Sequence, residues 1–261
     1  MLVRHCAKFT VTLVLATLLG GAMWGQEQQQ QSPWKDRAEY DLYNSIVQVL
    51  DSYSEKYPES NFKENILLMY VQTYQGLKQA DKMYDAALKL LEMNPKNFQG
   101  IYFMVSLTAS MQKTDPEFLA RGEQYSKQLL EQVEQLPKPA NLSDGDWKKQ
   151  TDALRVLGRQ TLGWIAMTKK DNAAAESEFR KVLQINPNNG QVSYYLGTVI
   201  IAQRDPAKQS EAFYHFARAS AYDGEGKMPE PGRQQVDSYL RKIYSSFHGD
   251  ESGLDEIYAM A

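Results

Sequence analysis

Several helical stretches of this sequence end in a similar way, with a proline directly after the last apolar or aromatic turn. The endings are Lys56-Tyr57-Pro58, Met93-Asn94-Pro95 and Ile185-Asn186-Pro187. Proline cannot continue a helix and also restricts the residue before it, so each ending marks a helix boundary. Between the boundaries apolar residues recur at spacings of three and four, and no stretch alternates with period two. The sequence therefore predicts an all-α chain with a repeated unit.

Residues 156–189 contain the clearest copy of this unit. The pattern is Leu-Gly in a first helix, then Ala-x3-Phe in a second helix, then a closing proline, over about 34 residues. The matching residues are Leu162, Gly163, Ala175, Phe179 and Pro187. The stretch resembles a tetratricopeptide repeat, although Arg159 and Ala166 replace the two aromatic residues of its first helix.

Weaker copies of the unit extend the resemblance along the chain. A second copy begins at Gly190, an earlier one spans residues 64–97, and a degenerate one runs from Phe98 to Pro137. Residues 36–57 fit one or two helices of a capping unit, and Arg233–His248 fits a closing amphipathic helix. The resemblance implies a right-handed α-α superhelix, a solenoid of about four to five helix pairs.

Glycines within the expected helices support this repeat. Gly158 and Gly163 lie inside one helix, where a glycine costs about 1 kcal/mol relative to alanine. A close crossing of two helices explains that cost, because a side chain such as Phe179 then fills the space above the glycine. Each helix pair leaves an apolar face that the next pair must bury.

The first 25 residues have the layout of an export signal. Arg4 and Lys8 precede the largely apolar run 9–19, which is followed by small residues. This is the order of a secretory signal peptide, and the run is short for a membrane span. We therefore expect a periplasmic or secreted protein. An uncleaved anchor formed by residues 9–25 remains the alternative, and it would be the only contact with a membrane.

The remaining chain divides by composition into three parts. Residues 26–35 form a Gln-rich linker that we expect to be disordered, residues 36–248 form the helical repeat domain, and residues 249–261 form an acidic, solvated tail. The formal net charge is −3, and it becomes about −5 without residues 1–25, which contain two basic residues and no acidic one. A nucleic-acid-binding protein would present a basic face, so this class is disfavoured.

No motif for catalysis, a metal or a cofactor stands out. Cys6 is the only cysteine and precedes the apolar run, so it is neither a lipidation site nor, after cleavage, a nucleophile or metal ligand. His215 and His248 are too far apart in the sequence to form a motif, and no phosphate-binding loop occurs. We predict a protein that is not an enzyme. A catalytic site hidden in loops 138–146 or 205–210 is the remaining enzyme alternative.

The register of the repeat predicts which side chains face its concave groove. In a tetratricopeptide array the first helix of each unit lines that groove. The predicted groove residues are Leu68, Gln72, Gln75, Tyr102, Ser106, Gln160, Trp164, Met167, Tyr194 and Thr198. They are aromatic, apolar or uncharged polar residues, a composition that suits recognition of a protein or peptide. The alternative for the aromatic residues is that they pack in the core.

These observations favour two functions. The first is an exported scaffold or adaptor that holds a partner protein or peptide in its concave groove. The second is a structural or assembly subunit of a cell-envelope complex, tethered by an uncleaved signal. The identity of the partner is not encoded in any motif, and the functional expectation rests on the likeness of the fold.

Overall fold

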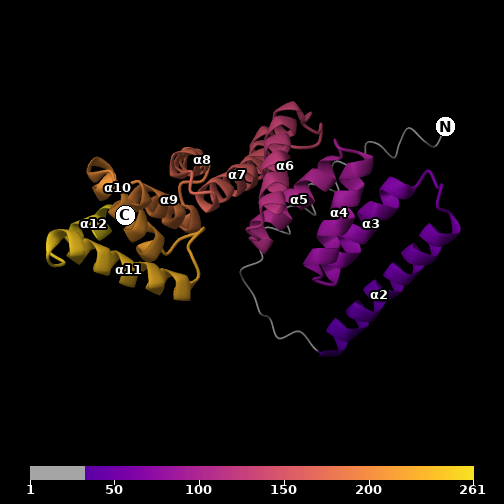
Figure 1. Cartoon of the computed structure of the whole chain (residues 1–261), viewed down its shortest axis with the longest axis horizontal. Helices are drawn as coiled ribbons and strands as arrows, with labels where there is room; N and C mark the ends of the chain where they lie inside the picture. Colours follow the sequence, from indigo (N-terminus) through magenta and orange to yellow (C-terminus); the bar gives the residue numbers. More distant parts are fainter. Residues whose placement is uncertain (1–32) are drawn as a thin grey trace. The chain divides into compact units, whose positions relative to one another are not determined.

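The computed structural model describes residues 33–261, and this part of the chain contains eleven α-helices, one short 3₁₀-helix and no strand (Figure 1). The expected all-α solenoid of consecutive helix pairs is therefore confirmed. The expected signal peptide, residues 1–25, and residues 26–32 of the expected linker lie outside the described residues.

The chain divides into two compact units that are not contiguous in sequence. Of the described residues, one unit comprises 33–113 and Glu131–Gln150, and the other comprises Thr114–Leu130 and Thr151–Ala261. The helices of the first unit are α2 (Pro33–Lys56), α3 (Lys63–Gly76), α4 (Ala80–Met93) and α5 (Phe98–Met111). Two helices pass from one unit to the other, α6 (Pro116–Gln135) and α7 (Asp144–Thr168). The second unit continues with α8 (Asn172–Ile185), α9 (Gly190–Ala202), η1 (Pro206–Lys208), α10 (Gln209–Ala221), α11 (Glu230–His248) and α12 (Leu254–Met260).

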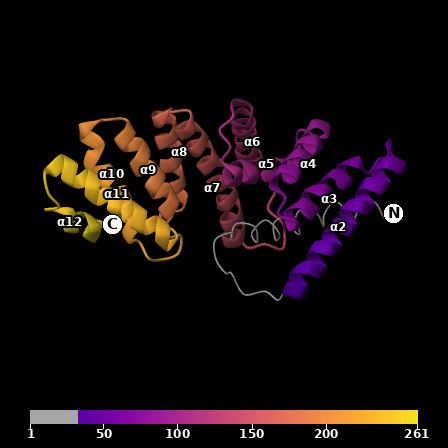
Figure 2. The ribbon, with the colours of Figure 1, turned by 60° about the horizontal axis from the view of Figure 1, so that its bottom comes forward.

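In the first unit each helix packs on the next one, α2 on α3, α3 on α4 and α4 on α5 (Figure 2). Val71, Leu90 and Met104 are fully buried between these helices. Hydrogen bonds connect the start and the end of the repeat at residues 64–97. The side-chain amides of Asn94 and Asn97 each donate to Glu64 Oε1 at 2.7 Å. Asn97 also accepts from the backbone N–H of Gly100 and thereby caps α5.

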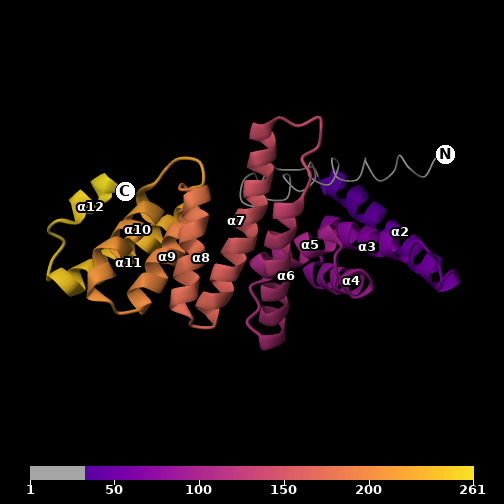
Figure 3. The ribbon, with the colours of Figure 1, turned by 90° about the horizontal axis from the view of Figure 1, so that it is seen from above.

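In the second unit α8 packs on α9, α9 on α10 and α10 on α11 (Figure 3). Its core is rich in aromatic and branched side chains that solvent does not reach. The largest are Phe179, Phe213, Phe216, Leu196, Ile200 and Leu240. This continuous core buries the apolar face that each helix pair would otherwise expose.

The glycines lie at close helix crossings, as the sequence predicts. A Cβ atom on Gly163 of α7 would stand 2.5 Å from a ring carbon of Phe179 on α8. On Gly158 it would stand 3.0 Å from Cγ of Leu130 on α6, and on Gly197 of α9 it would stand 3.0 Å from the ring of Phe216 on α10. Real Cβ atoms essentially never show a contact of 2.5 Å, so the crossing at Gly163 requires glycine. The contacts of 3.0 Å at Gly158 and Gly197 are tighter than nine in ten real ones, so a side chain there would push its neighbour aside.

Four residues with a left-handed backbone give an independent measure of the repeat. Lys78, Gln112, Lys170 and Arg204 have φ values of 55°, 49°, 63° and 58°. Lys78 and Gln112 are separated by the 34 residues of one repeat, and so are Lys170 and Arg204. Each lies just after the first helix of its unit, where the chain turns toward the second helix. The degenerate copy that begins at Phe98 therefore keeps the same turn as the clear copy.

The structure corrects two of the expected boundaries. Helix α2 begins at Pro33, inside the expected linker 26–35, because proline is well tolerated in the first turn of a helix. Residues 249–261 are not a solvated tail, since they contain α12 and bury Leu254 to 2% exposure. The acidic residues Asp255 and Glu256 are exposed, but apolar residues that follow them pack on the second unit.

Candidate partner-binding face

The predicted groove residues of the first unit are only partly accessible. On α3, Gln72 is exposed, whereas Leu68 and Gln75 are half-buried. On α5, Tyr102 is buried at 9% exposure and shares a hydrogen bond with the half-buried Ser106. Burial raises the pKa of Tyr102. The ring of Tyr102 is thus part of the packing of its unit.

In the second unit, Trp164 is also a packed residue. It is 8% exposed and forms a small apolar cluster with Leu119 and Ile165, against which Met167 and Tyr195 pack. For Tyr102 and Trp164 the structure therefore matches the core alternative. Gln160, Met167, Tyr194 and Thr198 are half-buried and keep part of their surface accessible.

Two tyrosines, Tyr194 of α9 and Tyr239 of α11, have rings close to the same buried Phe216 of α10, and we call them the Tyr194–Tyr239 pair. Tyr239 of α11 is 42% exposed and meets the ring of Phe216 edge-on, with 5.3 Å between the ring centroids. The ring of Tyr194 on α9 lies 6.2 Å from the same Phe216. Burial and the nearby Tyr194 raise the pKa of Tyr239, so its hydroxyl is protonated at neutral pH.

Both hydroxyl groups of the Tyr194–Tyr239 pair are available. Among residues 33–261 neither Tyr194 nor Tyr239 makes a side-chain hydrogen bond through its hydroxyl. The side-chain hydroxyl of Thr198 donates to the carbonyl of Tyr194 at 2.9 Å. A tyrosine at an interface offers a large apolar ring and a polar tip at a low entropic cost, which makes the pair suited to binding a protein surface.

Sequence reasoning missed Tyr239. The repeat register ends at residue 219 because the closing helix contains no Leu-Gly pair to anchor it. The apolar spacing of Val236, Leu240 and Tyr244 identifies the buried side of α11, and Tyr239 lies beside that stripe. That spacing is the signal that places Tyr239 at the border between the core and solvent.

Uncharged amides connect α7 to the start of α9. The side-chain amide of Asn189 donates to Gln160 Oε1 at 3.2 Å and links the start of α9 to α7. Asn189 also accepts from the backbone N–H of Val192 and caps α9. The side-chain oxygen of Gln160 is therefore used to connect α7 and α9, and only the accessible part of this half-buried side chain could contact a partner.

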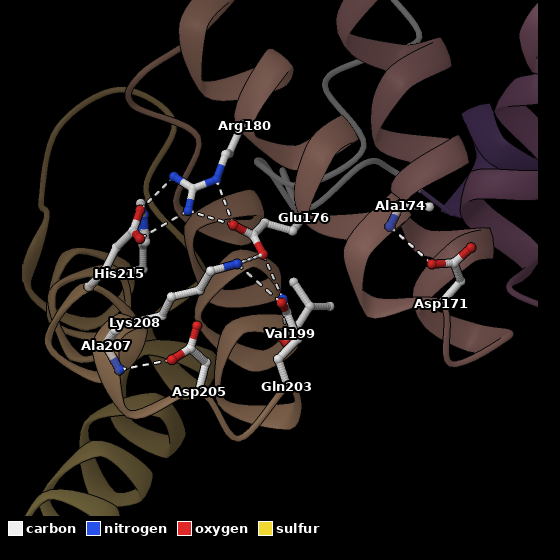
Figure 4. A network of polar contacts seen from close by, with 11 residues as sticks. Asp171, Ala174, Glu176, Arg180, Val199, Gln203, Asp205, Ala207, Lys208 and His215 are labelled. Atoms are coloured by element: carbon white, nitrogen blue, oxygen red, sulfur yellow. Dashed lines mark hydrogen bonds and ion pairs between the residues drawn. The ribbon is translucent and has the colours of Figure 1, made fainter.

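A second feature of this unit is a polar network between α8, α9 and α10 (Figure 4). Arg180 donates to Glu176 at 2.6 Å and to Glu211 at 2.5 and 2.9 Å. Glu176 also accepts from Gln203 at 2.6 Å and from Lys208 at 2.8 Å. Two cations therefore balance two carboxylates, and the network leaves no net charge to attract an ionic ligand.

The environment of the network shifts the pKa values of its members. Burial alone would raise the pKa of Glu176, but the hydrogen bonds from Lys208, Gln203 and Arg180 outweigh it and lower the pKa to about 2. The hydrogen bond from Arg180 lowers the pKa of Glu211. Burial lowers the pKa of His215 to about 4, against the opposing effect of Glu211. His215 is accordingly neutral at pH 7.

The network borders an open depression of about 370 Å³. Its walls come from α8, α9 and α10, and the lining residues are Arg180, Leu183, Gln184, Leu196, Glu211, Tyr214 and His215. His215 Nδ1 has no hydrogen-bond partner but is shielded from the surface, so a bound group could not reach it in this conformation. We therefore interpret the depression as the gap between two packed repeats and not as a ligand-binding pocket.

No described residues assemble a metal site. Among residues 33–261 no group of three or more histidine, cysteine, aspartate or glutamate side chains is arranged to hold a metal ion. His215 is buried beside Tyr214, and His248 stacks on Tyr244 with 4.2 Å between the ring centroids. Across the same residues, no helix combines the length and the apolar composition needed to cross a membrane.

The paired helices, the glycine crossings and the 34-residue spacing of the left-handed turns define an α-helical repeat protein. Comparison with protein families gives the particular repeat: the tetratricopeptide repeat model matches residues 159–189. The match covers α8 and the last part of α7, with Gly163 and Phe179 at the crossing. No curated protein matches the chain.

Proposed function

We propose that this chain is an exported scaffold that binds a partner protein or peptide through the accessible face of its repeats. Tetratricopeptide repeats generally serve protein–protein interaction, and residues 159–189 are such a repeat. The proposal extends this general role to a surface, the Tyr194–Tyr239 pair with Thr198 bonded to the backbone of Tyr194. The half-buried Met167 remains a candidate contact. The predicted groove residues of the first unit, Leu68, Gln72 and Gln75, remain candidates for a second contact.

The observation that supports this surface most strongly is the pair of free tyrosine hydroxyls above Phe216. Tyrosine is among the residues that dominate binding energy when an interface covers them. The ring of Tyr239 is held in place by its edge-on contact with Phe216, so little conformational freedom remains to be lost on binding. The two side chains of the pair are uncharged, which favours apolar and hydrogen-bonding groups of the partner over salt bridges at this point.

The experiment compares the wild-type chain with Tyr194→Ala, Tyr239→Ala as baits in extracts of the cell envelope. A partner held by this surface is retained by the wild type and weakened by the double variant about 30-fold or more, since the loss of even one hot-spot tyrosine costs about 2 kcal/mol. The matched control is Tyr214→Ala, Phe247→Ala, which removes two aromatic rings of the same unit outside the pair.

Three outcomes separate the interpretations. Loss in the Tyr194, Tyr239 variant alone supports the proposed surface, provided that its circular dichroism is that of the wild type. Equal retention by all baits contradicts it, because the partner is then held by surfaces that none of these substitutions changes. Loss only in the Tyr214, Phe247 variant moves the contact to the depression between α8 and α10 or to the end of α11.

Export belongs to the same proposal and has its own test. Residues 1–25 have the layout of a signal peptide, and cleavage would give a mature chain that starts within residues 23–26. Mass spectrometry of the N-terminal peptide after cell fractionation decides between a cleaved protein and an anchored one. An intact N-terminus in the membrane fraction would favour the alternative function, a tethered subunit of an envelope complex.

A further inference from the structure

The surface under helix α12 is an interaction site that this chain itself occupies. Leu254 is buried, and Ile257, Tyr258 and Ala261 pack against the core of the second unit. These residues follow the i, i+3, i+4, i+7 spacing of an amphipathic helix. The contact of α12 is with α10, and its polar side carries Asp255 and Glu256 into solvent.

Polar contacts from α10 and α11 fix the position of α12. The Tyr258 hydroxyl donates to Asp237, and Arg218 donates to the carbonyl of Ala261 at 3.1 Å. Burial and the hydrogen bond to Asp237 raise the pKa of Tyr258. The surface thus combines an apolar strip with two polar groups. The carboxylate of Asp237 accepts a hydrogen bond from a hydroxyl on the helix, and the guanidinium of Arg218 donates to a carbonyl at the helix end.

The segment that leads into α12 is loosely attached. Gly249 and Gly253 bound it with φ values of 90° and 87°, and the residues from 249 to 253 are exposed. The backbone N–H of Gly249 donates to the carbonyl of Ser245 at 2.8 Å and holds one end of the segment. Two side-chain contacts hold the rest: the Tyr244 hydroxyl donates to the carbonyl of Ser252 at 2.9 Å, and Arg241 donates to Glu251 at 2.6 Å. The second is a surface ion pair, which contributes little.

Helix α12 is also too short to persist without this surface. It has seven residues, whereas an isolated helix in water needs about 12 to 15 residues to be even marginally stable. Its helicity therefore depends on docking, and undocking and unfolding occur together. Segments of this kind open more easily than the core on which they rest.

We propose that the face of α10 and α11 beneath α12 is a docking site for an amphipathic helix of a partner protein, and that α12 holds this site in cis until the partner displaces it. The partner helix has apolar residues at i, i+3, i+4 and i+7 and a hydroxyl or amide donor that reaches Asp237. This site differs from the Tyr194–Tyr239 pair and does not depend on it.

Hydrogen exchange of the unmodified full chain gives the first test. The amides of α12 exchange on the order of 100-fold faster than those at the centre of α10, because α12 opens without unfolding the unit. Equal protection of α12 and α10 overturns the proposal, since α12 would then be a permanent part of the core.

Binding in trans gives the second test. A labelled synthetic peptide of residues 249–261 binds the full-length variant Leu254→Asp, whose own α12 is undocked, at least tenfold more tightly than the wild type. The same peptide with leucine 254 replaced by aspartate binds neither chain. Absence of peptide binding to a variant that retains the wild-type circular dichroism overturns the proposal.

A third measurement separates a foreign partner from a second copy. The wild-type chain stays monomeric in light scattering at increasing concentration if the site awaits another protein. A concentration-dependent dimer that disappears in Leu254→Asp overturns the proposal, because α12 of a second copy would then be the occupant. Where Leu254→Asp fails to fold, Tyr258→Phe replaces it, and α12 is expected to exchange about tenfold faster than in the wild type.

Discussion

The substitution Gly163→Ala tests the helix crossing on which the repeat depends. The new methyl group would lie 2.5, 2.7 and 3.0 Å from three ring carbons of Phe179, which is fully buried. Overpacking of this kind costs about 1–3 kcal/mol, whereas alanine gains about 1 kcal/mol over glycine within a helix. We therefore expect a net loss of up to about 2 kcal/mol in the free energy of unfolding.

The assay is urea unfolding of the full chain, followed by circular dichroism, with Gly145→Ala as the matched control. Gly145 lies in the same helix, and a Cβ there would meet only the Ser143 hydroxyl, at 3.9 Å. The control should be neutral or stabilising by up to about 1 kcal/mol. Adding Phe179→Leu to Gly163→Ala should recover part of the loss, because the smaller side chain leaves room for the methyl group.

A Gly163→Ala chain that is as stable as the Gly145→Ala chain would refute this reasoning. It would mean that the two helices separate at no cost, so that the glycine is not required by the crossing. An additive double variant, in which the two losses simply sum, would likewise show that the two residues do not interact.

Three further predictions concern other positions. Lys170→Gly should raise the free energy of unfolding by about 0.5–1 kcal/mol in denaturant titrations, because a left-handed backbone strains any residue with a Cβ. A loss of stability would show that the lysine side chain has another role. His215 has a folded-state pKa of about 4, below its ordinary value of 6.5, so the unfolded chain binds the proton first and the free energy of unfolding falls as the pH drops from about 6.5 to 4. The variant His215→Gln should remove roughly 2–3 kcal/mol of that pH dependence. An unchanged pH profile would argue against a buried neutral histidine. Trp164→Ala should cost about 3–5 kcal/mol, whereas Tyr239→Ala should cost less than about 1.5 kcal/mol, and equal thermal shifts for the two would contradict the assignment of one to the core and the other to the surface.

The helices and the repeat register are predictable from the sequence. Leu-Gly and Ala-x3-Phe are local requirements of a close crossing, so the spacing of Gly163 and Phe179 along the chain is enough to pair them. The left-handed turns at Lys78 and Gln112 show that even a unit with degenerate residues keeps the register. Backbone geometry is thus preserved where the side-chain pattern has faded.

The orientation of individual groove residues is not predictable in the same way. The register assigns Trp164 to the concave face on the assumption that each neighbouring helix pair is regular. Helix α6, in the degenerate unit 98–137, has 20 residues and places Leu119 against the indole, so the ring is covered by a helix that is longer than the regular pattern assumes. Burial of a residue depends on such non-local contacts, which a local motif does not specify.

The acidic stretch at residues 249–261 shows how charge can conceal an apolar contact. Its carboxylates indicate a solvated segment, whereas Leu254, Ile257 and Tyr258 span too few residues for a periodic signal to stand out. The role of these three side chains depends on a surface built by α10 and α11, which the composition of the segment does not specify.

The division of the chain into non-contiguous units has a consequence for synthesis on the ribosome. The first unit needs residues 131–150, and these emerge only after residues 114–130, which belong to the second unit. The first unit therefore cannot be completed before part of the second has been made, and the segment 114–130 must wait for residues 151–261. No single cut in the chain yields two intact halves, so a product truncated or nicked between residues 114 and 150 divides at least one unit.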